Sequence, residues 1–155
     1  MIKKITVLLM ILSVTASFSF AGGWDSKKGM DKINLDGELV CIGCSLKKLD
    51  GANAQCNIYA HHAIGFKMKD GTLWSIVDNA KGHDIIRAHS LLEHKKATIS
   101  GWIFPLAHYI ELDAINVQGV SKGQIQKAGH EEDMILSKKL GSRKIGQAPE
   151  SGHTH

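Results

Sequence analysis

Residues 63–77 read AIGFKMKDGTLWSIV and have the pattern of two β-strands joined by a tight turn. In the first half, apolar residues alternate with glycine or lysine, as in a strand with one buried face. The Asp70-Gly71 pair at the centre is typical of a β-hairpin turn. The second half, Thr72 to Val77, is rich in apolar residues that favour a returning strand. This hairpin is the centre of the predicted fold.

Further strands are expected on both sides of the hairpin. Glu38 to Cys41 predicts a short strand before it, while Lys96 to Phe104 and Tyr109 to Val117 predict two strands after it. Between these, the apolar residues from Asp84 to His94 recur with helical spacing. The order of three strands, one helix and two strands predicts a mainly β fold. Its expected form is a five-stranded OB-fold-like barrel with one helix between strands 3 and 4.

The first 21 residues have the features of a cleaved signal peptide. Lys3 and Lys4 precede an apolar run from Ile5 to Phe20, and small residues lead up to Ala21. The run is shorter than the about 20 apolar residues that a membrane-spanning helix needs. No cysteine directly follows Ala21 to carry a lipid. We therefore expect export to the periplasm without a membrane anchor.

The remaining chain divides by composition into three parts. Residues 22–34 are a polar lead-in, residues 35–118 hold the predicted barrel domain, and residues 119–155 form a polar tail that we expect to be partly disordered. The formal net charge of +4 includes the two signal lysines, so the exported domain is close to neutral. This balance argues against nucleic-acid binding. The serine, phosphate-loop and H-E-x-x-H motifs of common enzymes are absent from the sequence, which predicts a non-enzymatic protein.

All three cysteines lie between the first strand and the hairpin, in the segment CIGCSLKKLDGANAQCNIYAHH. Cys41 and Cys44 have C-x-x-C spacing, Cys56 follows, and His61 and His62 close the segment. Three thiolates and one imidazole form a ligand set that suits tetrahedral zinc, and soft thiolates also suit copper(I). The segment therefore predicts one zinc or copper(I) ion per chain, held by the three cysteines and one of the two histidines.

Two other uses of the cysteines stay open. In an oxidising compartment, Cys56 can form a structural disulfide with Cys41 or Cys44, and the barrel would then be a stapled module that binds a periplasmic protein partner. Alternatively, Cys41 and Cys44 form a redox-active pair for thiol–disulfide exchange or electron transfer. This use has less support, since no helix is expected to begin at Cys41. Covalent haem attachment is excluded because Ser45 stands where C-x-x-C-H requires histidine.

Histidines elsewhere in the chain are expected to be solvated. His83, His89 and His94 lie on or beside the predicted helix. The first and the last of these are three turns apart, too far to hold one ion together. His153 and His155, in the polar tail, are expected to face solvent in the same way.

Three features of residues 35–118 occur together: the Asp70-Gly71 hairpin, the strand segment KATISG that ends at Gly101, and the cysteine–histidine segment after the first strand. With these features the chain resembles small secreted bacterial OB-fold proteins. Among secreted OB-like proteins, small copper-binding metallochaperones are one precedent. The resemblance implies the barrel fold and no settled activity, and the metallochaperones enter by analogy of fold alone. For the predicted metal site, a structural role and metal delivery both stay open.

Overall fold

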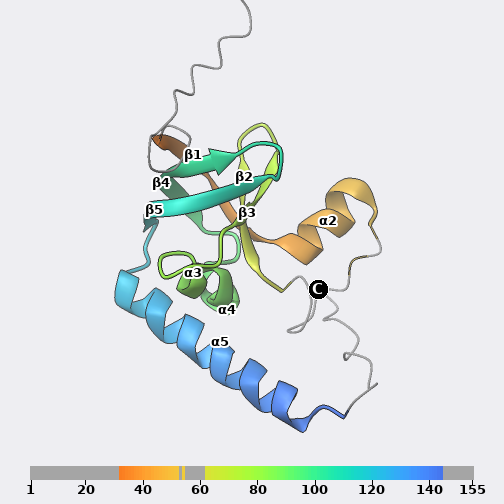
Figure 1. The fold of residues 1–155 in the computed structure, drawn as a ribbon. Coiled ribbons are helices and arrows are strands. Elements are labelled where there is room, and N and C mark those ends of the chain that lie inside the picture. Colours follow the sequence, from red (N-terminus) through yellow and green to blue (C-terminus); the bar gives the residue numbers. More distant parts are fainter. Residues whose placement is uncertain (1–31, 53, 55–61, 145–155) are drawn as a thin grey trace, which may run out of the picture. The chain divides into compact units, whose positions relative to one another are not determined.

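The computed structural model describes residues 32–52, 54 and 62–144, and Figure 1 shows their arrangement. Five strands form one closed barrel in the order β1-β2-β3-β5-β4. β3 pairs with β5 in parallel, and the other neighbours are antiparallel. The predicted five-stranded barrel is confirmed. The strands are β1 (Lys32–Cys41), β2 (Ile64–Met68), β3 (Leu73–Ile76), β4 (Lys96–Phe104) and β5 (Tyr109–Val117).

The β2–β3 hairpin forms where the sequence predicts it. The Thr72 N–H donates to the Asp70 carboxylate at 2.8 Å, which fixes the turn. Gly71 has a φ of 90°, a backbone conformation that glycine adopts without the strain of a Cβ. Phe66 and Trp74 are paired across the two strands, and both are buried in the core. The turn therefore sets the register that brings these aromatic rings inside.

β1 is longer than the sequence pattern predicts. It begins at Lys32, inside the stretch of residues 22–34 that reads as a lead-in. The extension is a partner of β4, with Lys32 paired to Trp102. Backbone pairing thus makes a strand of residues whose own composition does not indicate one.

The barrel core is made of apolar side chains that are almost completely buried. Alternate residues of each strand point inward, as the sequence alternation predicts. Each fully buried leucine, isoleucine or phenylalanine contributes about 1.5–3 kcal/mol through removal from water. Cys41, the last residue of β1, is buried to a similar extent, with 1% of its surface exposed. The largest of these side chains are Phe66, Leu39, Ile64, Leu92, Ile99, Ile110 and Leu112.

Two short helices stand in place of the single helix predicted between β3 and β4. They are α3 (His83–Arg87) and α4 (His89–Leu92). The backbone at Ala88 leaves the helical region, with φ −74° and ψ 46°, and this kink separates them. Both helices bury apolar side chains against the barrel, and Leu92 is fully buried. Because of the kink, both short helices can pack their apolar side chains against the barrel.

A further helix, α2 (Ile42–Asp50), follows β1 without a break (Figure 1). From the sequence, no helix is expected to begin at Cys41, and this prediction is wrong, because α2 starts directly after Cys41. The helix ends at Gly51, whose left-handed backbone (φ 62°) lets its N–H donate to the Leu46 carbonyl. This cap stabilises a short helix whose apolar residues Ile42, Leu46 and Leu49 recur at helical spacing.

The longest helix, α5 (Lys122–Ser142), lies within residues 119–155, whose composition predicts a polar, partly disordered tail. It starts with a capping box, in which the Ser121 hydroxyl accepts from the Gln124 N–H and the Gln124 side chain accepts from the Ser121 N–H. A Cβ at the buried Gly129 would lie 3.0 Å from the Asp84 Cα, so glycine permits close packing on α3. Neither α5 nor any other helix in the described part of the chain is long and apolar enough to cross a membrane.

His83 on α3 and Asp133 on α5 hold these two helices together. Nε2 of His83 lies 2.7 Å from the Asp133 carboxylate, and Nδ1 lies 2.7 Å from the Asp78 carboxylate. Arg87 adds a second contact, with 3.1 Å between its Nε and Asp133. The hydrogen bond with Asp133, followed by that with Asp78, raises the pKa of His83 above its ordinary value of 6.5. The folded protein therefore favours the charged imidazolium.

The pH dependence of folding should report this contact. Because the His83 pKa is higher in the folded state than the ordinary 6.5, its contribution to stability is complete below pH 6.5 and is lost as the pH rises through the folded pKa. His83→Gln should remove this part of the pH dependence from urea unfolding curves recorded between about pH 5.5 and about pH 8.5. His130→Gln, at an exposed position of α5, is the control and should keep it. An unchanged profile in His83→Gln would contradict the assignment.

Candidate metal centre

Cys41 ends β1 at the point where the barrel wall meets α2. Its side chain is 1% exposed, and its backbone pairs with Ile64 at the start of β2. The N–H of Ile42 donates to the Ala63 carbonyl at 3.0 Å, so the first residue of α2 is fixed to the segment that enters β2. His62 stands immediately before Ala63. The register of β1 with β2 therefore brings Cys41 and His62 to the same end of the barrel.

α4 supplies the second part of the site. His89 is its first residue and is 6% exposed. Glu93 follows one turn later, with 3.5 Å between the His89 Nε2 and the Glu93 carboxylate. The end of the helix is fixed to β1, because the Leu39 N–H donates to the Lys95 carbonyl and the His94 N–H donates to the Leu39 carbonyl, both at 2.8 Å. β1, which ends at Cys41, therefore also fixes the position of α4.

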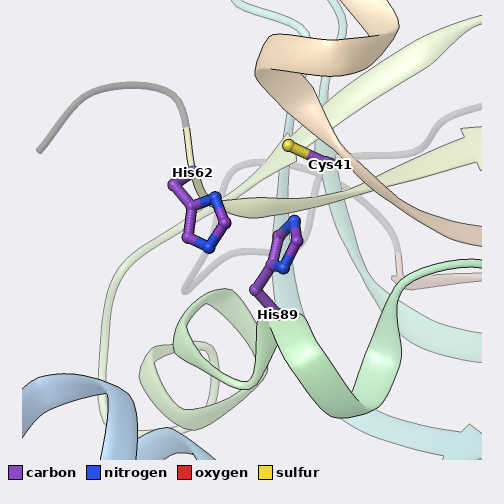
Figure 2. Close-up of side chains that lie close together, drawn as sticks. All are labelled: Cys41, His62 and His89. Atoms are coloured by element: carbon purple, nitrogen blue, oxygen red, sulfur yellow. The ribbon is translucent and has the colours of Figure 1, made fainter. Parts of the chain in front are cut away.

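Two groups of three ligand atoms converge at this end of the barrel. In the first, the sulfur of Cys41 and ring nitrogens of His62 and His89 all lie within 4.8 Å of one another. Figure 2 shows both imidazoles beside the thiol, with His89 rising from α4. In the second, the sulfurs of Cys41 and Cys44 and a carboxylate oxygen of Glu93 lie within the same distance. We name the first the histidine triad and the second the cysteine–glutamate triad; they share Cys41.

The histidine triad has the donors and the size of a metal site. Zinc binds cysteine sulfur at about 2.3 Å and histidine nitrogen at about 2.0–2.1 Å, so in tetrahedral geometry two such ligand atoms lie about 3.6 Å apart. The triad atoms lie within 4.8 Å of one another, so they need to move only a short distance to share one ion. One thiolate and two imidazoles suit zinc and copper, whereas calcium and magnesium prefer oxygen ligands. The donor set thus favours a soft or borderline ion.

His62 and His89 also contact each other as stacked rings. Their centroids are 3.7 Å apart, and their planes differ by 25°. His89 is buried and His62 is half-buried, so the pair lies between the core and the surface. An imidazole binds an ion through a nitrogen lone pair that lies in the plane of the ring. Both rings therefore have to rotate out of the stack before they can share one ion.

The predicted ligands fall into two groups in the structure. Cys41, Cys44 and His62 all take part in the triads, and the structure holds no disulfide between the two cysteines. Cys56 and His61 lie outside the described residues. The structure therefore brings three of the predicted ligands to one place, and the roles of the other two stay predictions.

The prediction that His89 is solvated is wrong, because the side chain is buried and belongs to the histidine triad. Its position carried a signal: it lies four residues after Ile85 and three before Leu92, both of which are buried. Residues at these helical spacings share one face. Glu93 was not predicted as a ligand. It lies four residues after His89, a spacing that places the two side chains on the same face of a helix.

The other two histidines of this region lie outside the triads. His94 exposes 66% of its side chain and pairs with Glu38 at 2.9 Å, in agreement with the expected exposure. His83 is half-buried between the two aspartates described above, so it is less solvated than the sequence predicts. His153 and His155 lie outside the described residues.

Comparison with known protein families, with curated proteins and with solved structures gives no match for this chain. The resemblance to small secreted OB-fold proteins therefore stays a prediction. The barrel and the two triads are the basis for a functional proposal.

In the metal-free protein, the stacked histidines should contribute to stability. A stacked ring pair is worth about 0.5–1.5 kcal/mol beyond its buried area, so His62→Ala should lower the free energy of unfolding by about that amount. Urea unfolding in the presence of a chelator measures the change. His130→Ala, at an exposed position on α5, is the control and should stay within about 0.5 kcal/mol of wild type. Equal losses in the two variants would contradict a stabilising stack.

Proposed function

We propose that this protein is a periplasmic metal-binding protein that holds zinc or copper at one end of its barrel. The observation that carries the proposal is the histidine triad, in which one thiolate and two imidazoles come together from separate parts of the chain. Cys41, His62 and His89 are the proposed ligands of one ion per chain. Export to the periplasm is supported by the signal-like composition of residues 1–21.

Metal delivery is the role that the exposure of the ligands favours. Cys41 and His89 are buried, whereas His62 and Glu93 are each partly exposed. An ion on the buried ligands is therefore within reach of a partner's ligands from one side. Structural zinc sites are closed by four protein ligands, whereas the histidine triad supplies three. We infer binding and delivery without catalysis, with a periplasmic protein partner as donor or acceptor of the ion.

A thiol–disulfide function is the second candidate, and the start of α2 favours it. Cys41 directly precedes the first residue of the helix, and Cys44 lies in its first turn. Redox-active C-x-x-C pairs are found at helix N-termini, where the helix dipole favours negative charge. Metal binding is the preferred candidate, because a redox dithiol needs neither the two histidines nor Glu93 at the same place.

The metal content of the reduced mature chain tests the proposal. After exposure to zinc or copper(I), native mass spectrometry and elemental analysis should give one ion per chain. His89→Asn should weaken binding at least about tenfold, because the loss of a mere supporting partner of a ligand already costs about 10–100-fold. His94→Asn is the matched control, since His94 lies in the same segment but is exposed and outside the triads.

Thermal unfolding gives a second readout. An ion that binds only the folded state raises the Tm. It should therefore do so for wild type and for His94→Asn, and much less for His89→Asn. Reduced wild-type protein that retains neither zinc nor copper would contradict the proposal. Equal weakening in the two variants would show that the ion is bound at another place.

A further inference from the structure

Cys41 has two partners with different chemistry. In the histidine triad it accompanies two imidazoles, and in the cysteine–glutamate triad it accompanies Cys44. We propose that oxidation of Cys41 and Cys44 to a disulfide releases the bound ion, so that thiol–disulfide exchange regulates metal binding. This inference rests on the proposed metal-binding function and adds its regulation.

The geometry brings the two sulfurs close enough for exchange. They lie within 4.8 Å of each other in the cysteine–glutamate triad, and a disulfide requires about 2.05 Å. Cys44 is in the first turn of α2, and Cys41 is the residue before that helix. A change in the two side-chain rotamers and a small shift of this turn can bring the sulfurs into contact. The rest of the barrel does not have to move.

Exposure sets the order in which the two thiols react. Cys44 is partly exposed, whereas Cys41 is 1% exposed. An external disulfide, RSSR, can therefore reach Cys44 first. Cys41 then acts as the resolving thiol from inside the protein.

The reaction is two successive thiol–disulfide exchanges. The Cys44 thiolate attacks one sulfur of RSSR, an S–S bond to Cys44 forms, and RS⁻ leaves. The Cys41 thiolate then attacks the Cys44 sulfur, the internal disulfide forms, and the second RS⁻ leaves. Two electrons pass from the cysteine pair to RSSR, and the protons of the two thiols end on two molecules of RSH.

The disulfide removes ligands from both triads at once. The histidine triad keeps only its two imidazoles, and the cysteine–glutamate triad keeps only its carboxylate. Affinity for zinc should fall by more than about 100-fold, because even the loss of an outer-shell partner costs about 10–100-fold. The coupling is reciprocal, so a bound ion should protect the reduced pair from oxidation.

Zinc release from the loaded mature chain tests the inference. The reduced protein is loaded with zinc, freed of excess ion and treated with oxidised glutathione, while a chromogenic chelator measures release. Wild type should release its zinc and lose the mass of two hydrogens, and peptide mapping should locate the disulfide at Cys41–Cys44. Reduction by a dithiol should restore binding.

Two variants separate this disulfide from one that involves Cys56. Cys56→Ser leaves Cys41 and Cys44 as the only pair and should still release zinc on oxidation. Cys44→Ser in the Cys56→Ser background keeps the histidine triad and leaves Cys41 without a disulfide partner in the chain, so it should bind zinc but show no disulfide-linked release. Ser45→Ala, in the same helical turn, is the control and should behave as wild type.

The outcomes separate the inference of redox-controlled release from the proposed metal-binding function on which it rests. A reduced wild type that binds no zinc or copper overturns both. A protein that binds zinc when reduced, and retains it with the Cys41–Cys44 disulfide mapped, overturns the inference alone. Oxidative release that maps to a disulfide with Cys56 also overturns it. The mapping on wild type decides the question even if a variant fails to fold.

Discussion

β1 is hydrogen-bonded along both edges, and the barrel and the site both depend on this. It pairs with β4 from Lys32 to Glu38 and with β2 from Gly37 to Cys41, which closes the barrel. A slip by one residue would turn every side chain to the opposite face and would break both ladders. The position of the last residue of β1 is therefore set by the whole strand. Leu39 also holds the chain that leaves α4, so a single strand fixes both sources of ligands.

The ligands come from places where regular structure begins or ends. Cys41 is the last residue of a strand, His62 lies two residues before one, and His89 is the first residue of a short helix. At the ends of strands and helices, hydrogen bonds to neighbouring elements fix the backbone, while the side chain can point away from the apolar core. Polar atoms then meet at the rim of the core, where a polar partner or a bound ion can offset the cost of their burial. The barrel thus provides a rigid frame with polar groups at one end.

Most of the strands and the helical segment between β3 and β4 could be predicted from the sequence, but α2, α5 and half of the site could not. β4 and β5 begin and end where the alternation predicts, because a half-buried strand imposes a period of two on its residues. α5 carries few apolar residues and begins with a capping box at Ser121, whereas α2 is a short helix that ends with a left-handed cap at Gly51. Hydropathy does not detect either cap. The burial of His89 depends on the kink between α3 and α4. The cysteine motif was visible because its spacing is local, whereas the approach of α4 to β1 is a property of the fold.

The three parts of the histidine triad are far apart along the chain, and this has a consequence for folding. An ion bound to these three side chains would link the end of β1, the entry to β2 and the start of α4, as a cross-link between distant residues does. Because such an ion binds only the folded arrangement, its binding free energy adds to the stability of the folded barrel. The ion would then help to hold the barrel closed once the exported chain has folded. A chain that loses the ion would keep the same strands, but local unfolding at that end of the barrel would become easier.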